Sequence, residues 1–267
     1  MKNVVITGST KGIGLGLAKE FLKRNCSVVI CGRNKEILKR ELIDLQRIFS
    51  KEKVAGQVCD VSDYAQVRIL WDTAVKKFGS VDIWINNAGI DNSILPYWEL
   101  DSSEIGPVVN TNLTGMMYGS HAALRGMIAK GFGQIYNVDG YGSNDMMRTG
   151  FTVYGSTKRA LRYFTVSLIQ EAEGLPIQVG RISPGMVLTD LMIDGLRKLP
   201  AEELDAIKGI YNIFADSVET VTPFLAEGVL ANTETGAKIT WLTEEKIQER
   251  LNSDEYIHRD LFSRYGL

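Results

Sequence analysis

The sequence predicts a single α/β domain built on a doubly wound parallel sheet, and three observations support this fold class. Short apolar runs typical of buried strands alternate along the chain with longer segments of helical period. Parallel strands need crossover helices that cover both faces of their sheet, so this alternation indicates a parallel arrangement. The length of 267 residues suits one large domain, and neither a linker nor an internal repeat divides it.

The expected strands are short and rich in Val and Ile. They are Val4–Ile6, Val28–Cys31, Val54–Cys59, Val81–Ile85, Gln134–Val138, Ile177–Ile182 and a weaker run at Lys238–Leu242. Between them, apolar residues that recur every three or four positions predict amphipathic helices. These helices are Ile13–Leu22, Glu36–Phe49, Val67–Phe78, Leu113–Ala129 and Tyr154–Ala172.

Two segments depart from this alternation. Met186–Ser217 is long and irregular in sequence, and insertions at the carboxyl edge of a parallel sheet commonly cover a ligand as a lid. Residues 244–267 are charged and of helical period. We interpret them as a C-terminal helical extension packed on the main domain, which spans residues 1–243.

The composition argues against several classes of protein. A net charge of −2 without long runs of one sign gives no indication of a nucleic-acid partner. No apolar stretch approaches the ~18 residues of a membrane span, and no signal peptide precedes the first strand. His121 and His258 lie far apart and no Cys/His cluster occurs, so we expect no metal site. Cys26, Cys31 and Cys59 have no CxxC spacing, which favours a reducing compartment and a cytoplasmic location.

A glycine-rich turn follows the first expected strand and opens the first helix. Its glycines let the backbone turn sharply and approach a pyrophosphate, while the helix N-terminus offers free N–H groups to the anion. The sequence therefore predicts a nucleotide phosphate site at this turn. Its residues are Thr7, Gly8, Ser9, Thr10, Lys11, Gly12, Ile13 and Gly14.

Four motifs together resemble the short-chain dehydrogenase/reductase family. Thr7–Gly14 resembles its TGxxxGIG fingerprint, and 86–89 (Asn-Asn-Ala-Gly) its NNAG signature. Tyr154 and Lys158 resemble its YxxxK active site, and 184–189 its PGxxxT segment. The resemblance runs from residue 3 to about residue 190 and implies a Rossmann-type oxidoreductase acting on CH–OH or C=O groups of a small-molecule substrate. It also implies a homodimer or homotetramer built on the helices that hold Asn112 and Tyr154.

The end of the second expected strand bears on the choice of nicotinamide cofactor. An acidic residue at this place would bind the ribose 2′-hydroxyl of NAD(H), but the strand ends at Gly32 and Arg33 without a carboxylate. The guanidinium of Arg33 suits a 2′-phosphate, and Lys11 adds a second cation. We therefore expect NADP(H), although both cations as ordinary surface residues remain the alternative.

The resemblance implies further cofactor contacts along the carboxyl edge of the sheet. These are expected from Asn34 after the second strand and from Asp60 and Val61 after the third, where the family contacts adenine. The remaining expected contacts are Asn87, Ala88, Gly89, Tyr154, Lys158, Pro184, Gly185, Val187 and Thr189.

Tyr154 and Lys158 lie four residues apart on an expected helix, and therefore on one face of it. A lysine cation beside a phenol favours the phenolate and lowers the tyrosine pKa from about 10. We expect Tyr154 to act as the general acid/base and Lys158 to tune it. Asn112 resembles the family's fourth catalytic position, where an asparagine holds a water for proton supply; Asn110 is the alternative residue for that position.

The chain departs from the family at the catalytic serine. Counting from Gly133 places Gly140 where the family has serine. Ser143, in a turn flanked by glycine, is our expected replacement as hydrogen-bond donor to the substrate oxygen. Asp139 in its protonated form is an alternative, as are Tyr141, a bound water, and Tyr154 acting alone.

The same segment has a narrower resemblance to the chlorophyll b reductase branch of the family. It rests on Asn137–Gly140 with Gly142 and Ser143, on Val153–Lys158, and on Ser183–Thr189. That branch reduces the formyl group of a large apolar tetrapyrrole, so we expect a bulky apolar substrate. Met146, Met147, Met186 and Met192 on expected pocket loops fit such a ligand, although core packing explains them equally well.

Two other functions compete with this interpretation. A non-catalytic NADP(H)-binding regulator of the same fold is disfavoured because both Tyr154 and Lys158 are present. An enoyl reductase acting on a C=C bond is disfavoured because its family pattern separates the tyrosine and lysine by more than four positions.

Overall fold

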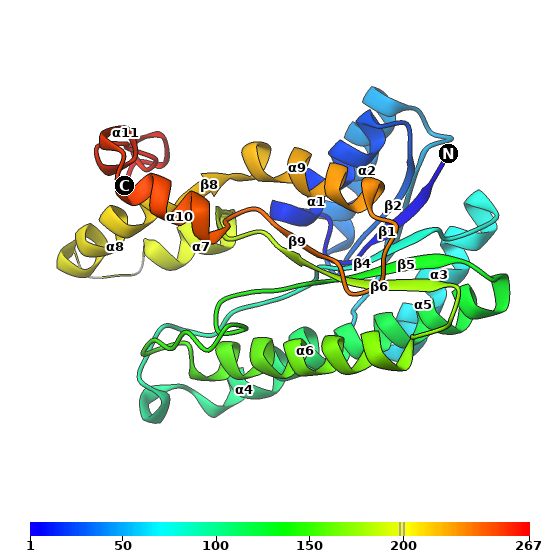
Figure 1. Ribbon diagram of the computed structural model, residues 1–267, viewed down its shortest axis with the longest axis horizontal. Helices are drawn as coiled ribbons and strands as arrows, with labels where there is room; N and C mark the ends of the chain where they lie inside the picture. Colours follow the sequence, from blue (N-terminus) through cyan, green and yellow to red (C-terminus); the bar gives the residue numbers. More distant parts are fainter. Residues whose placement is uncertain (198, 200) are drawn as a thin grey trace.

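The computed structural model describes residues 1–197, 199 and 201–267. A seven-stranded sheet, parallel throughout, lies at the centre of the molecule in the order β3-β2-β1-β4-β5-β6-β9 (Figure 1). The doubly wound α/β class is therefore confirmed. The strands are β1 (Asn3–Ile6), β2 (Ser27–Gly32), β3 (Val54–Val58), β4 (Ile83–Asn86), β5 (Gly133–Val138), β6 (Ile177–Ser183) and β9 (Lys238–Thr240).

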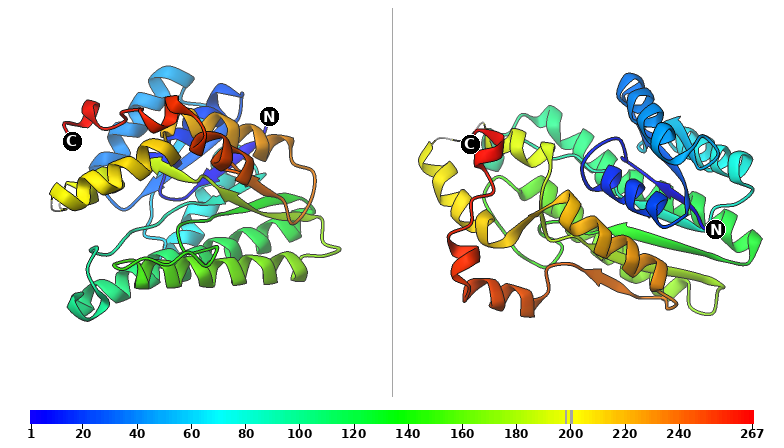
Figure 2. Two further views of the ribbon diagram at one scale, coloured as in Figure 1. Left: turned by 60° about the vertical axis from the view of Figure 1, so that its left-hand side comes forward. Right: turned by 90° about the horizontal axis from the view of Figure 1, so that it is seen from above.

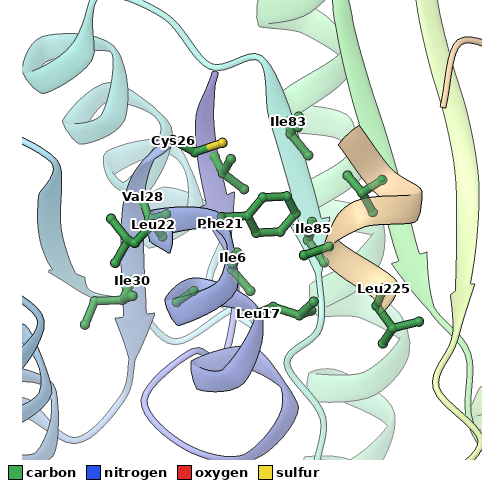
Figure 3. Close-up of a cluster of buried hydrophobic side chains, with 14 of the residues drawn as sticks. Ile6, Leu17, Phe21, Leu22, Cys26, Val28, Ile30, Ile83, Ile85 and Leu225 are labelled. Carbon is green, nitrogen blue, oxygen red and sulfur yellow. The ribbon is translucent and has the colours of Figure 1, made fainter. Parts of the chain in front are cut away.

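Helices cover both faces of this sheet, which is why its central strands read as nearly continuous apolar runs. The helices α1 (Gly12–Lys23), α2 (Lys35–Phe49) and α9 (Val218–Ala231) pack on one face. The helices α3 (Tyr64–Phe78), α5 (Gly115–Lys130) and α6 (Thr152–Glu171) lie on the other (Figure 1). Figure 3 shows the first core, where Leu17 and Phe21 of α1 and Leu225 of α9 meet Ile6 and Ile85.

The connection between β4 and α5 contains elements that the sequence pattern did not predict. A short 3₁₀ turn (Tyr97–Glu99) precedes α4 (Ser102–Val109), whose first turn is capped by the Asp101 carboxylate at 2.9 Å from the Ser103 N–H. A single π-helical turn (Asn110–Thr114) then joins α4 to α5. Such turns are frequent at functional sites.

The segment Met186–Ser217, expected to be irregular, is mostly regular. It contains β7 (Met186–Leu188), α7 (Asp190–Leu196), α8 (Ala201–Phe214) and β8 (Ala215–Ser217), and β7 pairs with β8 in a separate parallel ladder. Its residues Lys198 and Pro200 lie outside the described part. The expectation of irregularity is wrong because the apolar residues of these elements pack together in one cluster that also includes Phe262.

The last part of the chain packs against this segment. It comprises α10 (Glu244–Leu251), α11 (Asp254–Ile257) and a 3₁₀ turn (Ser263–Tyr265), which lie beside α8 (Figure 2). The Thr243 hydroxyl caps α10 by accepting a hydrogen bond from the Lys246 N–H. In the described residues, we find no helix that combines the length and apolar character needed to cross a bilayer.

Candidate active site

The sequence-predicted site residues converge where the strand order reverses between β1 and β4. In open α/β sheets, ligands bind at such a switch point, outside the carboxyl ends of the strands. The glycine-rich turn leaves β1 here, and Asn87–Gly89 leaves the neighbouring β4. The two loops that carry the strongest motifs are therefore adjacent.

Hydrogen bonds hold these two loops together. The Thr7 hydroxyl oxygen accepts from the backbone N–H groups of Asn87 (2.9 Å) and Ala88 (3.0 Å). The Asn87 amide donates back to the carbonyls of Thr7 (2.9 Å) and Gly8 (3.1 Å). Gly8 has a φ of 62°, and a Cβ there would lie 2.7 Å from Ala88 Cα, so this position requires glycine.

The start of α1 has the properties of an anion site. Lys11 precedes the helix without a side-chain cap, and the first turn carries no acidic residue. The N–H groups of that turn are therefore available to a phosphate, as the dipole of the helix also favours. Ser9, by contrast, is fully buried, and its hydroxyl is engaged with Ile6 O (2.6 Å) and Cys31 N (2.9 Å). Its side chain shapes the turn.

Two cations stand beside this turn. Lys11 and Arg33 are both exposed, and neither forms an ion pair within the described residues. Asn34 follows Arg33, and its side chain caps α2 by accepting from two backbone N–H groups, each at 3.0 Å. Arg33 and Lys11 are thus free to bind a 2′-phosphate, whereas the Asn34 side chain is occupied.

The other expected cofactor residues border the same edge. Asp60 follows β3 and accepts hydrogen bonds from the Ser62 N–H (3.0 Å) and hydroxyl (2.7 Å). Val61 is buried beneath α5. Thr189 caps α7, and its methyl group would lie 3.4 Å from a Cβ at Gly12. The segment 184–189 therefore lies beside the glycine-rich turn at Gly12.

Tyr154 and Lys158 share one face of the first turns of α6. The Lys158 ammonium lies 5.5 Å from the centre of the Tyr154 ring and donates to Val138 O at 3.4 Å. Lys158 is only 4% exposed. A Cβ at Gly89 would lie 3.9 Å from Lys158 Nζ and 3.4 Å from Asn112 Oδ1, so these two groups meet beside the loop after β4.

Asn112 lies in the π-helical turn and is fully buried. Its Oδ1 accepts from the Ile90 N–H (2.8 Å), and its Nδ2 donates to Ile90 O (2.9 Å) and the Thr157 hydroxyl (3.3 Å). Asn110, the alternative residue, is exposed. Asn112 therefore fastens the loop after β4 to α6. The two alternative residues differ in burial, because Asn112 is fully buried and Asn110 is exposed.

A second asparagine, which sequence reasoning missed, reinforces this connection. Asn92 is buried, and its Oδ1 accepts from the backbone N–H of Tyr154 at 3.2 Å. Its Nδ2 donates to Gly150 O (2.9 Å) and Ser93 O (2.8 Å). No pattern in the sequence marks this residue, because its partners come from distant segments.

A buried polar network lies beneath these groups. The Asn86 amide donates to the Ser120 hydroxyl (2.9 Å) and to Asn137 Oδ1 (2.8 Å), and Asn137 donates to the Thr165 hydroxyl (2.9 Å). The network joins β4, β5, α5 and α6, which are the elements that carry or adjoin the candidate catalytic side chains. Satisfied networks of this kind fix the relative placement of core elements.

The structure gives a steric reason for glycine at position 140. A Cβ there would lie 2.6 Å from the Tyr154 hydroxyl and 2.8 Å from Lys158 Cε. Ser143 belongs to the turn that begins at this glycine, with its N–H 3.1 Å from Gly140 O. Asp139 instead forms an ion pair with Arg181 at 3.6 Å, with both side chains largely buried.

Burial dominates the protonation of the catalytic pair. It raises the pKa of Tyr154 well above its usual range, and the negative charge of Asp91 raises it further. Burial also lowers the pKa of Lys158 to about 8, against the opposing effect of Asp139 and Asp91. The expectation that Lys158 lowers the Tyr154 pKa is therefore wrong for this structure, because burial of the phenol and the charge of Asp91 both raise this pKa.

Asp91 is a further ionisable group of the site that the motifs did not reveal. Burial raises its pKa to about 6, although the Asn92 N–H and the Lys158 charge oppose this shift. A carboxyl group whose folded pKa exceeds its unfolded value contributes stability at low pH, and this contribution is lost as pH rises through the folded value.

Asp91→Asn is therefore expected to gain stability relative to the wild type between pH 5 and pH 8. With a folded pKa of about 6, the relative gain should be about 1 kcal/mol. Urea unfolding at both pH values measures it. Asp44→Asn, which removes an exposed carboxylate on α2, is the control. A relative stability of Asp91→Asn that does not change with pH would contradict the assignment.

Comparison with known proteins agrees with this geometry. A family model described as short chain dehydrogenase matches residues 2–198. Chlorophyll(ide) b reductase NOL of Oryza sativa subsp. japonica is 39% identical over 86% of this chain and 66% of that protein. The probable chlorophyll(ide) b reductase NYC1 of the same organism is 36% identical, over 92% of this chain and 51% of that protein. The chain thus spans about half to two thirds of these relatives.

The fold also matches solved structures. The actinorhodin polyketide ketoreductase with NADPH superposes with a TM-score of 0.77 at 26% identity, covering 90% of this chain and 95% of that one. The resemblance noted in the sequence, both to the family and to the chlorophyll b reductase branch, is confirmed as a similarity.

Proposed function

The chain belongs to the short-chain dehydrogenase family of oxidoreductases, and on this premise we propose that it uses NADP(H) to transfer hydride to or from a carbonyl or alcohol carbon. The observation that carries the proposal is the meeting of Tyr154, Lys158 and Asn112 beside the loop after β4, which is hydrogen-bonded to the glycine-rich turn. The residues present fit a dinucleotide, because α1 offers uncapped N–H groups and two unpaired cations flank them. When bound, the nicotinamide supplies hydride at its C4 atom.

Tyr154 is the proton donor in this proposal. Its raised pKa keeps the phenol protonated at neutral pH, which suits donation to a carbonyl oxygen during reduction. Lys158, whose pKa is lowered by burial to about 8, lies 5.5 Å from the centre of the Tyr154 ring and is our proposed source of the proton that restores the phenol.

We propose a bulky apolar aldehyde or ketone as substrate. Large apolar side chains are exposed on the two loops that border Tyr154, including Trp98 (83% exposed) and Met147 (89%). The loops are fastened to each other by the Asn92–Gly150 hydrogen bond. The relatives named as chlorophyll(ide) b reductases support a formyl or ketone group on a large ring system as the reacting class.

Oxidation of NADPH across aldehydes and ketones graded by size tests this function. We expect turnover to rise with the apolar area of the substrate. Absence of turnover throughout, together with tight NADPH binding, would instead favour the non-catalytic regulator. The presence of both Tyr154 and Lys158 in catalytic geometry argues for the enzyme.

Arg33→Gln is expected to weaken NADPH binding by about 10- to 100-fold, since charge-assisted hydrogen bonds are worth about 1.5–3 kcal/mol. NADH binding should change little, because NADH has no 2′-phosphate. Fluorescence titration of both cofactors measures the preference. Arg40→Gln, on the exposed face of α2, is the control. Equal or tighter binding of NADH by the wild type would contradict the assignment of NADP(H).

Ser143 remains our proposal for the second hydrogen-bond donor to the substrate oxygen. It is supported by the turn that begins at Gly140, and no hydrogen bond occupies the Ser143 hydroxyl within the described residues. The ion pair of Asp139 with Arg181 makes that carboxyl group a weaker alternative.

Ser143→Ala should therefore lower kcat by about 10²- to 10³-fold, the usual cost of losing such a donor. Steady-state kinetics on the substrate with the highest turnover measure the loss. Ser156→Ala, which removes an exposed hydroxyl on the same helix as Tyr154, is the control. A loss below about threefold, far under that range, would remove Ser143 from the mechanism.

Assembly, compartment and domain division are further parts of the proposal. Met117, Leu124 and Phe164 line an apolar hollow between α5 and α6, which supports a homodimer or homotetramer through these helices.

The three buried, unpaired cysteines support a cytoplasmic location, although the plant relatives are named as chloroplastic. The start of α10 at Glu244 supports a main domain of residues 1–243 and an extension of 244–267. Light scattering in solution measures the assembly.

A further inference from the structure

The C-terminal residues 244–267 pack against the segment 186–217. We call residues 244–267 the C-terminal arm and residues 186–217 the lid. Phe262 of the arm is 1% exposed and packs in one apolar cluster with Leu188, Leu196 and Ile207 of the lid. The arm therefore supplies part of the lid's own core.

Two arginines of the arm also hold the end of α8. The last carbonyls of a helix have no partner within it. Arg250 donates to Phe214 O at 3.2 Å, and Arg259 donates to Asn212 O at 2.7 Å and to Ala215 O at 2.6 Å. Both arginines pair with the buried Asp216, at 2.7 and 3.3 Å. The position of the end of α8 is thus set by the arm.

Tyr211 lies on α8, directly before Asn212, whose carbonyl accepts a hydrogen bond from Arg259. Its ring packs edge-on against Phe262, with centroids 6.3 Å apart. The side chain of Arg148 lies beside its hydroxyl, and Asp91 and Tyr141 lie close enough to affect its pKa, which burial raises. Asp91 is also the group whose charge acts on Tyr154.

Two ring contacts lead from Arg148, the neighbour of Tyr211, to Tyr154. The Arg148 guanidinium lies 5.5 Å from the centre of the Phe151 ring, and Phe151 lies 6.2 Å from the Tyr154 ring, edge to face. Arg148 has no acidic partner among the described residues. Arg148 and Tyr211 therefore form a polar pair, and the ring of Phe151 lies between Arg148 and Tyr154.

We infer that Tyr211 is a substrate-positioning residue of this active site, held there by the C-terminal arm. An arginine has only donors, so beside Arg148 the Tyr211 hydroxyl can only accept from it, and the Tyr211 proton is free for the substrate. Together the pair offers donors to a second acceptor oxygen on the substrate, distinct from the carbonyl oxygen that receives the Tyr154 proton. The inference rests on the proposed function for the placement of substrate beside Tyr154.

The test compares 6-formyl-2-naphthoate, which carries a second acceptor group, with 2-naphthaldehyde, which does not. Each is titrated into the protein saturated with NADP⁺, so that binding is measured without turnover, and KM and kcat are then measured with NADPH. Tyr211→Phe should weaken binding and raise KM about three- to tenfold for the naphthoate only, the usual effect of one hydrogen bond. The value of kcat should change little. Tyr163→Phe, which removes a hydroxyl from a residue that is 79% exposed on α6, is the control.

Phe262→Ala tests the role of the arm. We expect faster hydrogen exchange in 201–214, unchanged exchange in β1 and β4, and the same selective loss of naphthoate binding as in Tyr211→Phe. Equal naphthoate binding by wild type and Tyr211→Phe, or no binding by the wild type, overturns the inference. Faster exchange with unchanged binding overturns the part played by the arm. Selective binding without any NADPH oxidation would leave this inference standing and refute the proposed function.

Discussion

Tyr154→Phe is expected to abolish carbonyl reduction while leaving NADPH binding nearly intact. The substitution removes only the hydroxyl, which in our mechanism delivers the proton to the substrate oxygen. Positioned acid/base groups are typically worth 10²- to 10⁴-fold in rate, so kcat should fall by at least about 10²-fold. Stopped-flow and steady-state kinetics with the best aldehyde measure the loss.

Two further measurements make this result interpretable. NADPH affinity should stay close to that of the wild type, because the ring and Lys158 remain in place. Thermal unfolding should change little, because Asn92 binds the backbone rather than the side chain of Tyr154. If more than about a tenth of the wild-type kcat survives, proton transfer is carried by another group.

Gly140→Ser, which restores the family's usual residue, is expected to damage this enzyme. The added Cβ would lie 2.6 Å from the Tyr154 hydroxyl and 2.8 Å from Lys158 Cε. Either the backbone after β5 or the catalytic pair must then move. Overpacking of this kind typically costs about 1–3 kcal/mol, and the displacement of Tyr154 should lower kcat/KM by about tenfold or more. Urea unfolding and steady-state kinetics measure the two effects.

Gly140→Ala separates steric from chemical causes. It adds the same Cβ without a hydroxyl, so it should reproduce most of the loss. Gly106→Ser on α4 is the control, because a Cβ there meets no other atom within 4 Å. A rise in kcat/KM for Gly140→Ser would show that the site accepts a serine and that Tyr154 can yield to it.

Local sequence patterns were sufficient to predict the sheet and its main helices. The runs in β1, β2 and β4 are largely apolar because both faces of the sheet are covered, and this burial is visible in the composition of each strand. The lid was harder to predict, because α7 and α8 owe their order to contacts with Phe262, Arg250 and Arg259 from outside the segment. The π-helical turn at 110–114 has no pattern distinct from the helix that follows it.

The residues of the candidate site that belong to sequence motifs were predicted. The residues that reach the site only through the tertiary structure were missed. Tyr154, Lys158, Asn112 and the glycine-rich turn were identified from motifs that resemble those of the family, and they lie at one edge of the sheet. The raised pKa of Tyr154 could not be predicted, because it depends on burial and on Asp91, which lies 63 positions away in sequence. Roles for Asp91, Asn92 and Tyr211 arise from tertiary neighbours that no local pattern records.

The docking of the C-terminal arm on α8 also bears on the order in which the site forms during synthesis. Chains grow from the N-terminus, and folded units form as they leave the ribosome. The residues of β1 to β6, with the glycine-rich turn and the Tyr154 helix, are made before residues 244–267. A nascent chain can therefore assemble the phosphate-binding edge while α8 still lacks Arg250, Arg259 and Phe262. On the proposals above, the dinucleotide site can thus form before the part of the site that positions the substrate is complete.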